Sequence, residues 1–160
     1  MKACSQRSFG SLVRLAAGAI ILLPLLAQEE GLSLNADKSL VGTWQVAVTP
    51  NGAPSFRAYN QFNADGTSIE FDNSNPPGQQ TIAVGPWKST GERQYVMFEV
   101  NQLFDPSGNY EGELHVSARI TLDRGGNTFD SSFTVEVFDT NDNLIAQAKG
   151  SAKGKRLSVS

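Results

Sequence analysis

Apolar and polar residues alternate along most of the chain beyond residue 40, with a period of two rather than the 3.6 of an amphipathic helix. Clusters of Gly, Pro, Asn and Asp separate the alternating segments. We therefore predict strands near residues 41–49, 56–63, 67–73, 83–90, 94–104, 110–122, 128–138 and 143–150, with a short further strand at 156–159. Eight strands in a plain meander predict an all-β fold, an antiparallel up-and-down barrel, because closure removes exposed sheet edges.

The turn residues indicate how neighbouring strands pair. Asp65-Gly66 is typical of a two-residue type I′ hairpin. Pro106-Ser107-Gly108 is typical of a three-residue loop with glycine in the left-handed conformation. Gly125-Gly126 and Asn141-Asp142 mark the last two hairpins.

With these turns, three neighbouring strands share one apolar face. Phe98 is predicted opposite Val116, and Val116 opposite Val135. The other face of the same strands carries Glu99 opposite His115 and is predicted to point outward. The outward side of the strand at 94–104 also carries a candidate contact patch, formed by Tyr95, Met97 and Leu103.

The inward positions define a candidate ligand-binding set. The Asp65-Gly66 hairpin places Asn60 inward together with Phe62 and Phe71. An eight-stranded barrel is just wide enough to be filled by side chains or to hold one small ligand. Small residues along the last strand favour a cavity, whereas Trp87 or the segment before residue 40 could fill that space instead. The predicted ligand-binding residues are Trp44, Phe62, Phe71, Phe98, Val116, Phe133 and Val135.

Few residues offer recognisable chemistry. His115 is the single histidine, which excludes a multi-histidine metal site. The chain also lacks a phosphate-binding glycine loop, a nucleophile elbow and zinc-ligand spacing. We therefore predict neither a metal nor a cofactor, and assign no catalytic residue. If the protein is an enzyme, the candidate catalytic residues are the polar groups Glu99, Tyr95 and Asn60. Glu99 would be the general acid or base, which requires the polar face to line the lumen instead.

Acidic side chains outnumber basic ones, sixteen to thirteen, which gives a formal net charge of -3. This balance disfavours a nucleic-acid partner. Glu70 and Asp72 lie two residues apart and so share one face of a strand. We interpret this pair as solvent-facing residues that keep the protein soluble.

Residues 1–27 have the features of a signal peptide. Three basic residues lead into an apolar run of twelve at 15–26, which is too short to span a bilayer. Cleavage would leave a polar lead-in at 28–39 and a barrel domain at 40–160, without cysteine or a stable membrane anchor. Loss of the three basic residues leaves ten against sixteen acidic ones, a net charge of -6. We expect an exported protein, secreted or periplasmic.

Gly42-Thr43-Trp44 on the first strand, followed by the eight-strand meander, resembles the calycin superfamily, in particular lipocalins and lipocalin-like bacterial exported proteins. The resemblance extends over most of residues 40–157. In lipocalins the tryptophan of this motif closes the base of the barrel and an arginine near the end of the last strand packs across it. The resemblance implies these barrel-closing roles for Trp44 and Arg156, and the binding of a small apolar molecule in the lumen.

Three hypotheses of function follow. The first is a binding protein for a small apolar ligand, which requires a ligand-sized cavity and no buried ionisable group. The second is a cofactor-free cyclase or isomerase resembling allene oxide cyclases, which requires a polar group inside the barrel. The third is a filled barrel that acts through its outer surface, with a homo-oligomer as one outcome.

Overall fold

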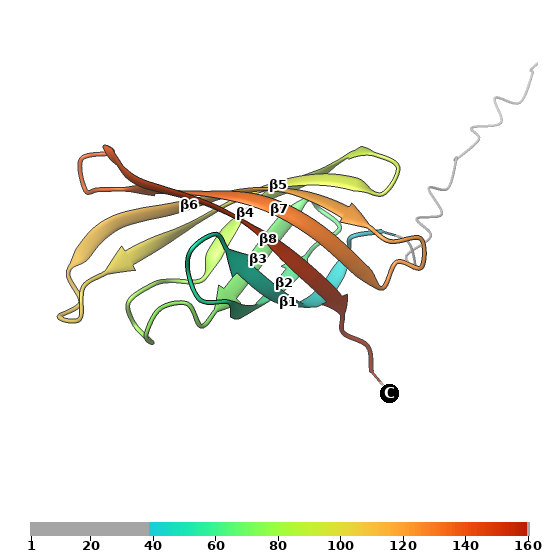
Figure 1. The fold of residues 1–160 in the computed structure, drawn as a ribbon, viewed down its shortest axis with the longest axis horizontal. Helices are drawn as coiled ribbons and strands as arrows, with labels where there is room; N and C mark the ends of the chain where they lie inside the picture. Colours follow the sequence, from blue (N-terminus) through green and yellow to red (C-terminus); the bar gives the residue numbers. More distant parts are fainter. Residues whose placement is uncertain (1–38, 160) are drawn as a thin grey trace, which may run out of the picture. The chain divides into compact units, whose positions relative to one another are not determined.

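The computed structural model describes residues 39–159 and forms a closed barrel of antiparallel strands (Figure 1). Each strand pairs with the next, and the last strand pairs with the first. The predicted all-β up-and-down barrel is thus confirmed. The strands are β1 (Gly42–Pro50), β2 (Phe56–Phe62), β3 (Thr67–Asp72), β4 (Ala83–Gly91), β5 (Gln94–Phe104), β6 (Tyr110–Leu122), β7 (Thr128–Phe138) and β8 (Leu144–Arg156).

Strand β8 differs from its prediction. It continues without a break to Arg156, so 156–159 is not a separate strand. The predicted signal peptide at 1–27, and the lead-in up to residue 38, lie outside the described residues. Within residues 39–159, no helix is long and apolar enough to cross a membrane.

One end of the barrel is filled by aromatic and aliphatic side chains. Trp44 is fully buried, and its ring centroid lies 5.0 Å from that of Phe129. The indole Nε1 donates a hydrogen bond to the carbonyl oxygen of Leu40 at 2.9 Å. Trp87 packs edge-on against Phe62 at this end, with ring centroids 5.8 Å apart. We refer to this end of the barrel as the closed end.

Arg156 seals the closed end. Its guanidinium carbon lies 4.2 Å from the centroid of the Trp44 ring, a cation–π distance. The guanidinium also donates to three backbone carbonyl oxygens, those of Gly126 at 2.7 Å, Val41 at 2.6 Å and Ser39 at 2.5 Å. Arg156, at the end of β8, is therefore hydrogen-bonded to the segment before β1 and to the turn before β7.

The β2–β3 hairpin has a different turn from the predicted one. Asn63 N donates to Thr67 O at 2.8 Å, which makes the loop three residues long, with Gly66 at φ +85°. The additional loop residue shifts the register by one position, and a one-residue shift turns every side chain to the other face. Phe71 is therefore outside, 56% exposed, and Glu70 points inward opposite Asn60.

A second shift reverses the face of β5. The loop at 106–108 has the predicted length, but a β-bulge at Gly112 inserts one residue into β6. As a result Glu99, not Phe98, lies opposite Val116. Phe98 points outward and is 39% exposed, so its predicted inward position is wrong.

The same reversal removes the candidate contact patch on β5. Tyr95 is only 8% exposed and Met97 lines the interior, with Leu103 on the same face. On the next strand pair the predicted register is confirmed, with Val116 opposite Val135. The β6–β7 turn therefore forms where its glycines indicated.

Candidate functional site

The other end of the barrel is hollow. A cavity of about 490 Å³ opens between the β1–β2 loop and the β3–β4 loop. Pro50 and residues 53–55 line it from the first loop, and residues 73–75 with Gln80 line it from the second. Side chains therefore fill the closed end of the barrel, whereas the other end is hollow. Trp87 packs in the closed end and does not occupy the cavity.

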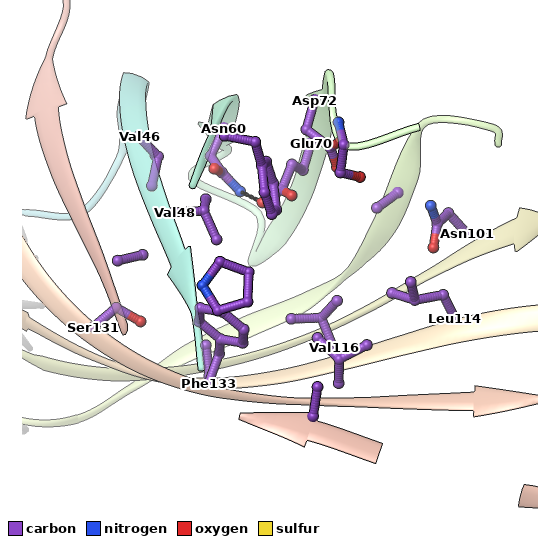
Figure 2. A pocket seen from close by; sticks show the side chains of 18 of the residues that line it. Val46, Val48, Asn60, Glu70, Asp72, Asn101, Leu114, Val116, Ser131 and Phe133 are labelled. Atoms are coloured by element: carbon purple, nitrogen blue, oxygen red, sulfur yellow. Dashed lines mark hydrogen bonds between the residues drawn. The ribbon is translucent and has the colours of Figure 1, made fainter. Parts of the chain in front are cut away.

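One wall of the cavity is apolar. It is formed mainly by the inward side chains of β1 and β6–β8, which the registers of these neighbouring strands align (Figure 2). Small residues on β6 and β8 leave room in front of this wall. Its main members are Val46, Val48, Leu114, Val116, Ala118, Phe133, Val135, Ala148 and Ala152.

The opposite wall is polar and comes from β2, β3, β5 and the β3–β4 loop (Figure 2). Asn60 is 3% exposed, and its Nδ2 donates to Glu70 Oε2 at 2.6 Å. Asp72 follows on the same face of β3, and Asn101 lies on β5. A ligand in the cavity would thus meet hydrocarbon on one side and carboxyl and amide groups on the other.

The β3–β4 loop contributes a hydrogen-bonded chain to the polar wall. Gln80 Nε2 donates to Asp72 Oδ1 at 3.0 Å. Gln80 Oε1 accepts from Asn75 Nδ2 at 2.7 Å and from Asn101 Nδ2 at 3.3 Å. Gln80 also pairs with Leu103 of β5 as an isolated bridge. These contacts hold the loop against β5 at the cavity mouth.

Glu99 is the most deeply buried charged residue of the site. It is 0% exposed, and neither carboxyl oxygen has a hydrogen-bond partner among the described residues. Burial raises the pKa of Glu99 to about 7, and the nearby Ser68 hydroxyl partly opposes that rise. The Ser68 hydroxyl itself donates to Gly85 O at 3.1 Å.

Glu70 lines the cavity and interacts electrostatically with Glu99. Burial, the charge of Glu99 and the charge of Asp72 raise the pKa of Glu70 to about 8, against the hydrogen bond from Asn60. Burial is the largest cause of both raised pKa values, and for Glu70 the charge of Glu99 adds to it. The interpretation of Glu70 and Asp72 as solvent-facing surface residues is wrong.

The predicted ligand-binding residues are divided by the structure. Phe62, Val116, Phe133 and Val135 line the cavity. Trp44 lies beyond them in the closed end. The outward Phe71 stacks on Tyr59, with ring centroids 5.3 Å apart. Phe98 likewise packs edge-on against His115 on the outer surface, at 5.4 Å.

The three candidate catalytic residues are all inside the barrel, in different places. Asn60 lines the cavity. Glu99 is fully buried and interacts electrostatically with Glu70. Tyr95 belongs to the closed end, where its ring lies 5.7 Å from that of Trp87. His115 stays outside and contacts Glu113 Oε2 at 2.9 Å rather than Glu99.

Sequence reasoning missed three polar cavity residues as part of a site: Glu70, Asp72 and Gln80. The one available signal was the pair of acids two residues apart on a strand. That spacing fits a solvent face equally well, and only the register of the hairpin distinguishes the two.

No family model and no curated protein matches this chain. Among residues 39–159, no group of three or more His, Cys, Asp or Glu side chains is placed to hold a metal ion. The site is therefore interpreted from its own geometry.

Proposed function

We propose that this protein binds a small, largely apolar molecule in the hollow end of the barrel. The observation that carries the proposal is the cavity of about 490 Å³, bounded on one side by a continuous aliphatic and aromatic wall. Ligand pockets in proteins commonly have this size and combine apolar lining with a few polar groups that fix orientation. The polar wall at Asn60, Glu70 and Asn101 supplies those groups.

The resemblance to lipocalins supports the same proposal. The Gly42-Thr43-Trp44 motif and Arg156 form the closed end, and the cavity lies at the other end of the barrel. With the leader expected at residues 1–27, we propose an exported lipocalin-like binding protein. Fold resemblance by itself supports only the class of activity and does not identify the ligand. The chemistry of the ligand must therefore be inferred from the residues of the site.

The proposal is tested by filling the cavity. Val116→Trp places an indole in the apolar wall, and Ser117→Trp is the matched control on the adjacent, outward and exposed position of β6. The probe is N-phenyl-1-naphthylamine, a neutral dye that fluoresces in apolar surroundings. We expect saturable one-to-one binding to the wild type and to Ser117→Trp, and at least tenfold weaker binding to Val116→Trp. Equal binding by all three proteins would refute a lumenal site.

Native mass spectrometry of the protein purified from its own host would identify the natural ligand. A bound compound of constant mass, released on denaturation, is the expected result. A mixture of related compounds that interconvert in the presence of the protein would instead indicate catalysis.

Catalysis is a second candidate because ionisable groups are buried in the barrel, contrary to the simplest binding hypothesis. Glu70 and Glu99 have pKa values raised to about 8 and about 7, the range in which a carboxyl group serves as a general acid or base near neutral pH. Asn60 holds Glu70 in place. A cofactor-free isomerase would use Glu70 to move a proton on a substrate held against the apolar wall. Glu70→Gln should then abolish interconversion while the compounds remain bound.

A further inference from the structure

Four side-chain amides of the polar wall, those of Asn60, Asn75, Gln80 and Asn101, donate hydrogen bonds to other residues of the wall. Asp72 Oδ1 accepts from Ser74 N at 2.6 Å and from Gln80 Nε2 at 3.0 Å. Because that oxygen accepts, the amide nitrogen of Gln80 must face Asp72, and Gln80 Oε1 faces the other way. The orientation of Gln80 is therefore fixed by its neighbours.

Gln80 in turn fixes the orientation of Asn101. Gln80 Oε1 accepts the amide hydrogen of Asn101 Nδ2 at 3.3 Å. Asn101 Oδ1 is left without a hydrogen-bond partner among the described residues, although Asn101 is only 5% exposed and lines the cavity (Figure 2). A buried unpaired carbonyl oxygen is unfavourable unless a ligand or solvent donates to it.

The same imbalance occurs on β3 and β5. Asn60 Nδ2 is used by Glu70 Oε2. Both oxygens of Glu99 lack a partner within residues 39–159. The described residues lining the cavity include two acids, Glu70 and Asp72, and no lysine, arginine or histidine. The unpaired buried atoms of Asn101 and Glu99 are thus oxygens, and no lining side chain could neutralise an ionised carboxylate in this wall.

We propose that the ligand's polar group is a protonated primary amine, seated against Glu70, Asp72 and Asn101 with its hydrocarbon part on the apolar wall. This inference rests on the proposed function and names its ligand class. An ammonium group carries three donors and no acceptor, which complements an acceptor-rich wall. A ligand carboxylate would place acceptors against acceptors and like charges together.

Isothermal titration with three probes of equal chain length tests the inference. The probes are n-octylamine, 1-octanol and octanoate, each titrated into the wild-type protein at pH 8. We expect octylamine to bind at least tenfold more tightly than octanol, and octanoate to bind most weakly. Binding of octanol tests the proposed function, and the ratio of octylamine to octanol tests the amine.

Two glutamate variants separate the site from the acidic surface. Glu70→Gln preserves the size of the side chain and the oxygen that accepts from the Asn60 amide. We expect this substitution to reduce the preference for octylamine over octanol to threefold or less. Glu111→Gln is the control, because Glu111 is an exposed glutamate on β6. It should retain the wild-type preference. Thermal unfolding of each variant verifies that it is folded.

The pH dependence supplies an independent readout. Glu70 is faced by Glu99 from β5, Asp72 from its own strand and uncharged Asn60 from β2. As pH rises from 6 to 9, Glu70 and Glu99 ionise while an alkylamine stays protonated. Octylamine should therefore bind at least about tenfold more tightly at pH 9 than at pH 6. Octanol binding should change little over this range.

The outcomes are distinguishable. Octanol binding as tightly as octylamine, or the same preference in Glu70→Gln as in the wild type, would overturn the amine and leave the lumenal binding site standing. Tightest binding of octanoate would overturn it as well. Failure of all three probes, together with failure of the naphthylamine dye, would overturn the proposed function itself.

Discussion

At the residue scale, Gly112 determines which side chains of β5 reach the interior. Its φ of +136° is rarely adopted by residues with a side chain. A Cβ atom there would lie 2.0 Å from the carbonyl oxygen of Phe138, a backbone atom that cannot move aside alone. Only glycine therefore allows the bulge that turns Glu99 inward.

Gly112→Ala should destabilise the protein by at least about 3 kcal/mol, because it combines an unfavourable φ with a backbone clash. Gly108→Ala is the matched control, since Gly108 also has a positive φ, +83°, but a Cβ atom there would meet nothing within 4 Å. It should cost about 1 kcal/mol. Urea unfolding followed by tryptophan fluorescence measures both. Equal effects of the two substitutions would contradict the assigned role of Gly112.

At the scale of elements, the barrel closes where β8 meets β1. Trp44 on β1 lies directly opposite Arg156 on β8. Gly42 permits this approach, because a Cβ there would lie 2.6 Å from Arg156 Nη1. The glycine, tryptophan and arginine thus act together at the closed end.

Arg156→Met should lower stability by about 3 kcal/mol, because the aliphatic packing is retained but three carbonyl oxygens and the Trp44 face lose their cationic partner. Lys155→Met, at the adjacent exposed position of β8, should change stability by less than about 0.5 kcal/mol. Calorimetric melting temperatures measure the difference. A Lys155→Met effect as large as that of Arg156→Met would contradict a special role for the arginine.

At the scale of the whole molecule, two sets of carboxyl groups have opposite effects on how the stability of the fold changes with pH. Asp105, Asp123 and Asp139 accept hydrogen bonds in the turns, which hold their pKa values below the usual range. Their stabilising effect is present above the unfolded-state pKa and is lost as pH falls through their folded-state values. Glu70 and Glu99 act in the opposite sense because burial raises their pKa values.

Stability should therefore be greatest near pH 5 and decrease toward pH 8. Between the unfolded pKa of about 4.3 and the folded values of about 7 and about 8, the folded state binds more protons, so the free energy of unfolding falls as pH rises. The decrease should be on the order of a few kcal/mol. Glu70→Gln should flatten it and raise stability at pH 8, while Glu111→Gln should not. Urea unfolding between pH 3 and 9 measures the profile, and stability that rises from pH 5 to 8 would refute it.

The strands and their order could be predicted from the chain because the signals are local. Alternation with a period of two depends only on which residues are apolar, and the turn residues act on their immediate neighbours. The eight strands, the antiparallel closure and the pairing of Val116 with Val135 follow from these signals. That Phe62, Val116, Phe133 and Val135 line the interior could be predicted for the same reason.

The faces of β3 and β5 were decided only by the tertiary structure. Each depends on one additional residue, in the loop between Asn63 and Thr67 and in the bulge at Gly112, and each additional residue turns a whole strand over. The apolar side of each strand suggested the opposite orientation, with Phe71 and Phe98 inward. The backbone geometry of the loop and the bulge overrides the hydrophobic pattern of these two strands. The sequence by itself determined the barrel and its apolar wall, and the tertiary register determined that Glu70, Glu99 and Asn101 point into the barrel.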